Sequence, residues 1–463
     1  MGSVRRPRAQ SGLSGTRSST RRIDGDAGED DETLLDGIER AAFGYFRQTV
    51  NPANGLVADT SRDGSPCSIA VVGFALSVYP VAVERGWMAR DEAVTLTLAA
   101  LRFFRDSDQS GSPTATGYKG FYYHFLDMHS GLRVWRSELS MIDTALLMAG
   151  VLTAREYFTA PTAPETELRQ IADELYRNVD WRWSQDGGAT IMQGWKPESG
   201  FLHYGWEGFT EGIVLYVLAL GSPTHPLTGD SYHSWTVTYQ WENLYGIDIL
   251  YAAPLFVYQF SHAWIDLRGI QDPFMRDKGS DYFENSRRAV LIQREYARRN
   301  PGGFAGYGED SWGLSAGDGP TGAGVEDRSR LFGYAARGVP YGPDDGTLAG
   351  SAALASLPFA PDIALEAVRA MHQRYPEMRL DHQYASGFNA GLVGADGKYW
   401  VSSGCYGLDQ GIVTMMIENY RTEFIWRLMR NCSYVVAGLR GAGFSGGWLE
   451  RELPDTPAHD ERG

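Results

Sequence analysis

The sequence has few cysteines, and those it has are badly placed for known cysteine-based sites. Its 463 residues include only Cys67, Cys405 and Cys432, which are far apart and odd in number. They match neither a disulfide framework nor a zinc cluster. The nine histidines lack the helical H-E-x-x-H pairing of many zinc enzymes. We therefore expect no metal site and no cofactor.

Long apolar runs and basic residues are also scarce. No apolar run reaches about 18 residues, the length that suggests a membrane-spanning helix. Lys and Arg number 42 against 57 Asp and Glu, so the formal net charge is −15. Such a charge repels nucleic acid and anionic lipid, and its simplest role is to keep the protein in solution. We expect neither a nucleic-acid nor a membrane partner, and the oligomeric state stays open.

The first 30 residues contain almost no apolar side chains. They are rich in Arg, Ser and Gly and then become acidic, which predicts a disordered tail over 1–30. Arg5 and Arg6 resemble a twin-arginine export signal, but no apolar stretch follows them. We therefore expect a cytoplasmic protein. No Pro/Ser-rich linker or internal repeat divides the remainder, which predicts a single domain over 31–463.

Apolar residues recur at helical spacing along most of this domain. Nine long helices are predicted, over 33–50, 69–85, 90–105, 141–158, 165–179, 211–220, 282–298, 362–375 and 411–429. Alternating strand patterns are few. Long loops rich in Gly, Pro and aromatic residues separate the helices, as over 302–350, and loops of this length are often functional. The pattern predicts an all-α fold, an α/α barrel whose aromatic loops form a cleft.

One group of polar residues precedes the apolar helix that starts near residue 141. Glu138 and Asp143 lie at the helix entrance, shortly after Trp135 and His124. The acids could simply cap the helix, with Ser140 or Asp143 as the capping residue. Aromatic rings, a histidine and acids together also suit a sugar-binding site, because ring faces stack on sugars.

Two further carboxylates stand between an aromatic or Gly-rich loop and a buried helix. Glu211 follows Trp206 and precedes the apolar stretch VLYVLAL, and Asp409 precedes IVTMMI. Partial burial would raise the pKa of Glu211, as a general acid requires near neutral pH. Each residue could equally be a first-turn acid favoured by the helix dipole or a cap.

Other clusters mix rings with hydrogen-bonding groups, and we expect them to bind sugar hydroxyls. One contains Gln259 and His262, and another contains Tyr307, Glu309 and Trp312. Such mixtures suit a neutral sugar better than a charged ligand. Each could also be an ordinary polar cluster in a loop.

Together these motifs resemble the glucoamylase-like family that includes the bacterial endo-β-1,2-glucanases of glycoside hydrolase family 144. The transglycosylase domain of cyclic β-1,2-glucan synthases is a wider relative. The resemblance spans about residues 34–449 and is carried by GFYYHFLD, SELSMIDTALLMAG, GWKPESGF, LYVLALGSPTHP, DYFENSRRA, GYGEDSWGL, PDDGT and IENYRTEFIW. It implies an (α/α)6 barrel and inverting hydrolysis of a neutral β-1,2-linked glucan or sophorooligosaccharide. It also implies that Glu211 is the general acid, that Asp409 is the base, and that Glu138 and Asp143 are further acids in the cleft.

The sequence departs from this family at several motifs. It has GFTEG around Glu211 where the family usually has GYNEA, VYQFSH for GHQYSH, and LSAGDGP for LTACDGP, with Gly317 in place of Cys. These positions are expected to line the cleft, so chain-length preference and endo or exo action stay open. The alternatives are a transglycosylase on β-1,2-gluco-oligosaccharides and a non-catalytic glucan-binding protein. Retention of the four acids argues against the second.

Overall fold

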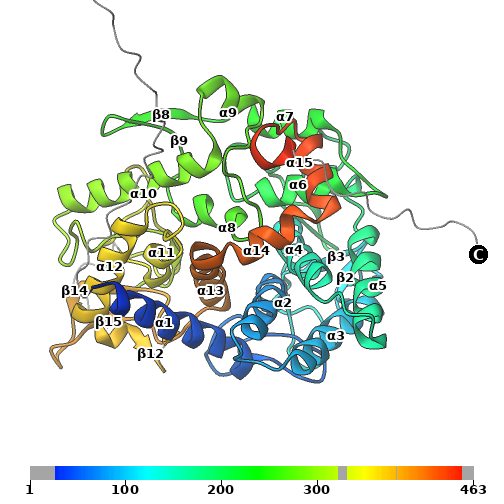
Figure 1. The fold of residues 1–463 in the computed structure, drawn as a ribbon, viewed down its shortest axis with the longest axis horizontal. Coiled ribbons are helices and arrows are strands. Elements are labelled where there is room, and N and C mark those ends of the chain that lie inside the picture. Colours follow the sequence, from blue (N-terminus) through cyan, green and yellow to red (C-terminus); the bar gives the residue numbers. More distant parts are fainter. Residues whose placement is uncertain (1–26, 322–330, 382, 451–463) are drawn as a thin grey trace, which may run out of the picture.

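A computed structural model of the protein describes residues 27–321, 331–381 and 383–450, and it is mostly helical, as predicted (Figure 1). Helix α1 begins at Ala27, so residues 27–30 are helical, whereas the rest of the predicted tail, 1–26, lies outside the described residues. Every predicted helical stretch contains a long helix. These are α1 Ala27–Thr49, α2 Ile69–Glu84, α3 Arg90–Asp106, α4 Met141–Tyr157, α5 Ala163–Asn178, α6 Ile213–Gly221, α10 Tyr282–Arg299, α12 Pro361–Arg374 and α13 Gly407–Thr422.

The single helix predicted over 411–429 is wrong, because the chain breaks at Glu423. This residue has a left-handed backbone with φ 57°, and it separates α13 from α14, Phe424–Arg430. Its carboxylate pairs with Arg268 at 2.9 Å and with Arg430 at 3.3 Å, and these ion pairs favour the break. The helices that the sequence did not predict are short: α7 Gly229–Thr236, α8 Phe256–Trp264, α9 Pro273–Lys278, α11 Gly350–Leu354 and α15 Ser433–Gly441.

The all-α prediction is only partly right, because short strands occupy the loops. One antiparallel sheet has five strands in the order β2-β3-β5-β6-β7, namely Gly117–Tyr118, Phe121–Tyr123, Leu139–Ser140, Gly194–Lys196 and Gly200–Phe201. Five antiparallel pairs complete the set: β1 Cys67–Ser68 with β4 Phe125–Leu126, β8 Trp241–Leu244 with β9 Ile247–Leu250, β10 Ala316–Gly317 with β11 Ala335–Ala336, β12 Arg379–Leu380 with β13 Gln383–Tyr384, and β14 Phe388–Val393 with β15 Tyr399–Val401. Strands this short are unlike the 4–8-residue runs whose alternation can be recognised.

The helices form a central set and a peripheral set. The central helices are α2, α4, α6, α8, α11 and α13, and contacts run from α4 through α2 to α13 and from α4 through α6 to α8. Gln259 of α8 donates a hydrogen bond to the carbonyl of Ala352 in α11 at 2.9 Å, and α8 and α11 both touch α13. Helices α1, α10, α12 and α15 pack outside α13, α8, α11 and α6 respectively. All nine residues of α6 are buried, as expected for a helix that is apolar on every side.

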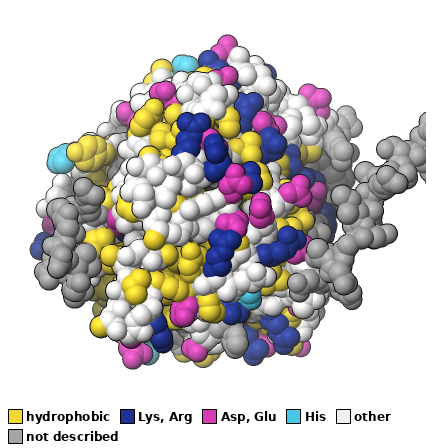
Figure 2. Space-filling view, turned by 90° about the vertical axis from the view of Figure 1, so that its left-hand side faces the viewer, with side chains coloured by type: hydrophobic (Ala, Val, Ile, Leu, Met, Phe, Trp, Pro, Cys, Tyr) yellow, Lys and Arg dark blue, Asp and Glu magenta, His cyan; other side chains and the backbone are white. Residues whose placement is uncertain are grey.

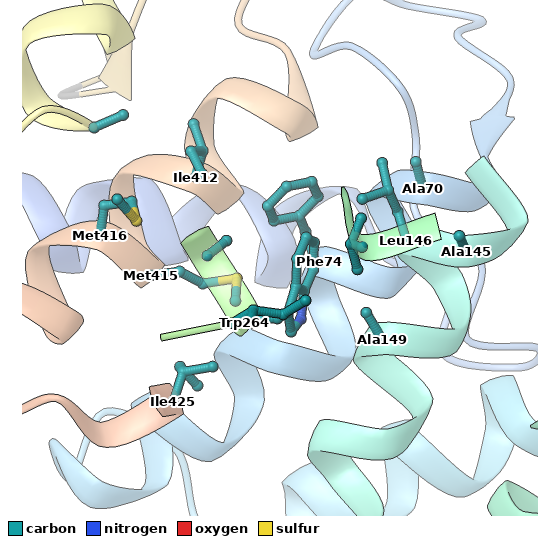
Figure 3. Packing of buried hydrophobic residues seen from close by; sticks show 14 of the residues in the cluster. Ala70, Phe74, Ala145, Leu146, Ala149, Trp264, Ile412, Met415, Met416 and Ile425 are labelled. Atoms are coloured by element: carbon teal, nitrogen blue, oxygen red, sulfur yellow. The ribbon is translucent and has the colours of Figure 1, made fainter. Parts of the chain in front are cut away.

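The core lies between the central helices, where large side chains from several of them meet (Figure 3). The ring of Phe74 in α2 lies 4.8 Å from that of Trp264 in α8, with Leu146 and Met415 close by. Helices α2 and α4 approach so closely that their backbones touch. A Cβ atom at Gly150 would lie 2.0 Å from the carbonyl oxygen of Gly73. Only glycine fits at such a crossing.

The surface carries charge of both signs. Acidic and basic side chains lie next to one another on the face shown in Figure 2. All three cysteines are free and buried inside the protein. Among the described helices, none combines the length and hydropathy that crossing a bilayer would require.

Candidate active site

A cavity of about 450 Å³ lies where several central helices begin. This volume is typical of a small-molecule site. Its wall includes residues at or just before the first turns of α4, α6, α8, α11 and α13 together with loop residues, among them Asp59, His124, Phe125, Asp143, Glu211, Gln259, Phe260, Gly317, Tyr334, Ser351, Ser386, Tyr406 and Asp409. Helix N-termini carry partial positive charge, so this end of the molecule favours anionic groups. The structure thus brings Asp143, Glu211 and Asp409 together, as predicted.

Glu211 lies two residues before α6 and is anchored through its backbone. Its carbonyl accepts a hydrogen bond from the Ser261 hydroxyl at 2.7 Å, and the same hydroxyl accepts one from the Val214 amide at 3.1 Å. Burial raises the pKa of Glu211 to about 7, and the nearby charge of Asp143 acts in the same direction. No cation among the described residues offsets this burial. The side chain can therefore hold a proton near neutral pH.

Asp409 lies in the first turn of α13 and has hydroxyl partners. Ser351, from the start of α11, donates a hydrogen bond to its Oδ1 atom at 2.8 Å. Burial raises the pKa of Asp409 to about 7, although the hydroxyls of Ser351 and Ser386 act in the opposite direction by stabilising the carboxylate. Asp409 is therefore a second carboxyl group that titrates near neutral pH.

His124 stands between two carboxylates. Its Nδ1 atom lies 2.9 Å from Glu138, and its Nε2 atom lies 3.5 Å from Asp143. Burial opposes the charged imidazole, but Asp143 and Glu138 outweigh it and raise the pKa of His124 to about 9. Ser140 is the cap of α4, because its hydroxyl oxygen accepts from the Asp143 amide at 3.2 Å. Glu138 itself does not line the cavity and stands behind His124.

His124, Glu138 and Asp143 are the one group of potential metal ligands among the described residues, with donor atoms within 4.8 Å of one another. However, the two carboxylates lie at opposite nitrogens of the His124 ring. A single ion could bind only one of these nitrogens. The arrangement therefore fits a protonated imidazole between two carboxylates better than it fits a metal centre.

Aromatic rings flank the cavity. The Trp135 side chain is 69% exposed, and its ring lies 5.1 Å from that of Phe125 in the cavity wall. Tyr334, which is 59% exposed, lies 5.8 Å from the ring of Tyr406. Trp135 also has a left-handed backbone with φ 57°, which is uncommon for a large residue and often marks function.

Several residues predicted to bind substrate do not reach the cavity. His262 is buried between α8 and α10, with its Nε2 atom 3.1 Å from the Ser286 hydroxyl, and burial lowers its pKa to about 3. Trp312 is completely buried in the core. The prediction that His262 and Trp312 contact the substrate is therefore wrong. Tyr307 donates to Asp344 at 2.6 Å, while the exposed Glu309 pairs with Arg294.

Two other residues predicted to bind substrate lie in the cavity wall or near it. Gln259 lines the cavity, and its amide nitrogen is fully used between helices, at 2.9 Å from the Ala352 carbonyl and 3.0 Å from the Ser356 hydroxyl. Trp206 lies on the loop before Glu211 and is half-buried against the core, outside the cavity wall.

Sequence reasoning missed one acidic residue of the cavity wall and its neighbours. Asp59 lines the cavity, and burial raises its pKa to about 6. Beside it, Arg62 forms an ion pair with Asp318, which also accepts from the Tyr406 hydroxyl at 2.9 Å. Asp59 reaches the cavity because the Gly407 amide, far away in the sequence, donates to the Asp59 carbonyl at 2.8 Å. No spacing in the sequence reveals that contact, so the sequence holds no signal for Asp59.

Residues 203–433 match the model of the Glycoamylase family, described as "Putative glucoamylase". This segment contains both Glu211 and Asp409. The chain belongs to the Glycoamylase family. Asp59, His124 and Asp143 lie before the matched segment, so the cavity combines Glycoamylase-family residues with others from the preceding part of the chain.

Several known proteins are similar to this Glycoamylase-family chain over most of its length. The exo β-1,2-glucooligosaccharide sophorohydrolase (non-reducing end) of Parabacteroides distasonis is 28% identical over 446 residues, which are 89% of this chain and 58% of that protein. The chain thus spans less than two thirds of this curated relative. A crystal structure of a "putative glucoamylase" from Bacteroides uniformis has a TM-score of 0.81 at 29% identity, covering 91% of this chain and 99% of that one. A β-1,2-glucanase structure from Parabacteroides distasonis has a TM-score of 0.79 at 26% identity, covering 89% and 60%.

Proposed function

We propose that this protein is a glycoside hydrolase that cleaves β-1,2-linked glucan or sophorooligosaccharides with two carboxyl groups. One observation carries the proposal: Glu211 and Asp409 line the same cavity, and burial raises the pKa of each to about 7. Inverting cleavage of a glycosidic bond needs one protonated carboxyl at the leaving oxygen and one carboxylate that activates water. Two groups that titrate near neutral pH can supply both forms.

The surroundings of the two groups decide their roles. Among the described residues no cation offsets the burial of Glu211, and the negative charge of Asp143 acts on it, so its protonated form is favoured and it acts as the general acid. Asp409 receives a hydrogen bond from Ser351 and lies in the first turn of α13, and both features favour its carboxylate form. Asp409 therefore activates the attacking water, directly or through a substrate hydroxyl.

The acids next to His124 support this division. The raised pKa of His124 keeps the imidazole protonated, and the hydrogen bond and charge of that imidazole lower the pKa of Glu138. The charge of Asp143 in turn helps Glu211 to retain its proton. Asp143 thus favours the protonated form of Glu211, while Glu138 pairs with His124.

We further propose that the fold is an (α/α)6 barrel. Six central helices alternate along the chain with peripheral ones, and five of them have residues at or just before their first turns in the cavity wall. Such an arrangement makes the central helices parallel and the peripheral helices their return paths. The loops between them then form the substrate cleft, with Trp135 at its edge.

The substrate class is supported by the cavity and by the names of similar proteins. Rings and neutral hydroxyl or amide groups make up much of the wall, as suits an uncharged sugar. The relative from Parabacteroides distasonis is named for β-1,2-glucooligosaccharides, and the similar structure from that organism is named a β-1,2-glucanase. The Gln259 carbonyl oxygen remains available to accept from a sugar hydroxyl, since its amide nitrogen is already engaged.

The test is to incubate the protein with β-1,2-, β-1,3- and β-1,4-glucans and starch and to chromatograph the products. We expect short gluco-oligosaccharides from β-1,2-glucan and little from the others. NMR should find the α-anomer in the first-formed product, because inversion at a β-linkage produces it. Hydrolysis of starch alone would rule out the substrate, and a β-anomer would rule out inversion.

A matched pair of variants tests the base. Asp409→Asn should lower turnover by about 10²–10⁴-fold, the usual contribution of general acid–base catalysis. Asp396→Asn makes the same chemical change at an exposed turn between β14 and β15 and should leave turnover unchanged. Equal activity in both variants would remove Asp409 from the mechanism.

A further inference from the structure

Asp59 is a fourth acid in the cavity wall, and the mechanism above does not use it. It lies in the segment between α1 and β1, and its backbone is held on both sides. The Asp59 amide donates to the Pro66 carbonyl at 2.8 Å, and the Gly407 amide at the start of α13 donates to the Asp59 carbonyl at 2.8 Å. Asp59 is therefore fixed to the same helix end that carries Asp409. Such rigid support is what a substrate-binding group requires.

The side chain of Asp59, by contrast, is without a hydrogen-bond partner in the part of the chain that the structure describes. No described residue donates a hydrogen bond to its carboxylate. Two neighbouring acids are engaged: Asp318 accepts from Ser402 at 2.6 Å and from Tyr406, and Asp409 accepts from Ser351. Polar groups away from bulk water are normally hydrogen-bonded. The partners of Asp59 must therefore come from what the cavity holds.

The charges that face Asp59 leave it ionised at neutral pH. His124 and Arg62 lower its pKa, Asp143 and Asp318 raise it, and burial is the largest influence, so that the pKa is about 6. Above that pH the group is a carboxylate, which accepts hydrogen bonds through two oxygens and donates none. Neighbouring hydroxyls of a sugar are donors at a spacing that two carboxylate oxygens can accept together.

We propose that Asp59 binds a vicinal pair of hydroxyls on the glucose unit in the cavity and thereby selects the linkage. The inference rests on the proposed function. An inner unit of β-1,2-glucan keeps its 3- and 4-hydroxyls free, whereas an inner unit of β-1,3-glucan lacks the free 3-hydroxyl and one of β-1,4-glucan lacks the free 4-hydroxyl. A site built to bind a hydroxyl strongly rejects a substrate that lacks it, because the polar group of the protein is then left unpaired.

The experiment compares Asp59→Asn with Asp63→Asn, the same change at an exposed position in the same segment. Kinetics are measured on β-1,2-, β-1,3- and β-1,4-gluco-oligosaccharides of equal length between pH 4.5 and 8. Hydrogen bonds to charged groups are worth enough to predict a fall of about 10–100-fold in kcat/KM for the β-1,2 substrate in Asp59→Asn. The preference of this variant for the β-1,2 linkage over the other linkages should narrow by a similar factor. Protonation of Asp409 lowers kcat/KM at acid pH in both proteins, and only the additional fall of the wild type below about pH 6 should be missing from Asp59→Asn. Asp63→Asn should behave as wild type.

The outcomes separate this inference from the proposed function. If the wild type cleaves β-1,2-glucan and Asp59→Asn keeps both its kcat/KM and its linkage preference, the role of Asp59 is overturned and the function stands. If the wild type cleaves another glucan instead, the function fails and so does the linkage argument. Loss of kcat alone, with azide restoring turnover to Asp59→Ala and forming a glycosyl azide, would make Asp59 the base and overturn the binding role.

A second measurement avoids any folding defect of the variant. The wild-type protein is given β-1,2-gluco-oligosaccharides whose inner units lack the 3-hydroxyl or the 4-hydroxyl. Each deletion should lower kcat/KM by about 10-fold or more, because one carboxylate oxygen loses its partner. Unchanged kinetics with both analogues would overturn the proposal.

Discussion

The substitution Glu211→Gln should lower activity and raise stability. Glutamine keeps the size of the side chain but has no proton to donate and no charge to bury. General acid catalysis contributes about 10²–10⁴-fold, so turnover on β-1,2-glucan should fall by about that factor. The effect on stability depends on pH and follows from the environment of Glu211 in the cavity.

The pKa of Glu211 rises from 4.5 to about 7 when the protein folds. Below pH 4.5 both states are protonated, and the carboxyl group has no effect on stability. As the pH rises from 4.5 to 7, the folded wild type becomes less stable, because over this range the unfolded chain releases the proton while the folded protein still holds it. A tenfold change in proton affinity is worth about 1.4 kcal/mol, so the full loss above pH 7 is about 3 kcal/mol. Glutamine removes this loss.

Thermal unfolding can measure the difference. An unfolding entropy of about 2.1 cal/mol/K per residue amounts to about 1 kcal/mol/K for 463 residues, so 3 kcal/mol corresponds to about 3 °C. Glu211→Gln should melt about 3 °C above the wild type at pH 8.5 and within about 1 °C of it at pH 5. Glu207→Gln, at an exposed position of the same loop, should change neither melting nor turnover.

Two results would refute this reasoning. A melting temperature at pH 8.5 equal to that of the wild type would show that burial does not raise the pKa of Glu211. Turnover near the wild-type value would show that Glu211 is not the acid, and the proton donor would then have to be Glu138 or Asp143.

Three further predictions concern other parts of the molecule. Trp135→Ala should lower kcat/KM by about 2–10-fold on long glucan chains and leave the shortest substrates unaffected, because its exposed ring can stack only on sugar units outside the cavity; equal losses at all lengths in a chain-length series would contradict this. Glu39→Gln should raise the melting temperature at pH 9 and leave it nearly unchanged at pH 4.5, because burial and the charge of Glu418 raise the pKa of Glu39 to about 8. A shift of equal size at both pH values would show that the change in stability does not come from the ionisation of Glu39. Activity should survive EDTA, since carboxyl groups alone can cleave a glycosidic bond; a loss that calcium or zinc restores would indicate a metal at His124.

The long helices could be predicted from the sequence because each carries an apolar pattern over several turns. The start of α2 at Ile69 and that of α4 at Met141 agree with the prediction to the residue. Helix α8 has nine residues, as α6 does, but α6 is apolar throughout, whereas α8 mixes rings with polar groups and was interpreted as a sugar-binding cluster. The break at Glu423 was missed because it depends on ion pairs with Arg268 and Arg430, and Arg268 lies far away in the sequence.

The site could be predicted only where a local pattern marks it. Asp143, Glu211 and Asp409 stand out because each lies at or just before the start of a buried helix. Asp59 carries no such mark, since its place in the cavity depends on contacts between distant segments. His262 and Trp312 were misassigned for a related reason. A sequence that mixes polar and aromatic residues looks the same whether its side chains face a cleft or the core, and these two side chains face the core.

The glycine contact between α2 and α4 restricts how new specificities can arise in this protein. Helix α4 carries Asp143 and Leu146 in the cavity wall, and its distance from α2 is set by backbone atoms at Gly73 and Gly150. Any larger residue at Gly73 or Gly150 would force the two helices apart and displace Asp143 and Leu146 in the cavity wall. Asp59, Trp135 and Tyr334 lie in loops outside this crossing, so changes to their side chains leave the contact between α2 and α4 intact. A mutant library confined to these loops should therefore contain more folded enzymes than one of equal size spread over the helices.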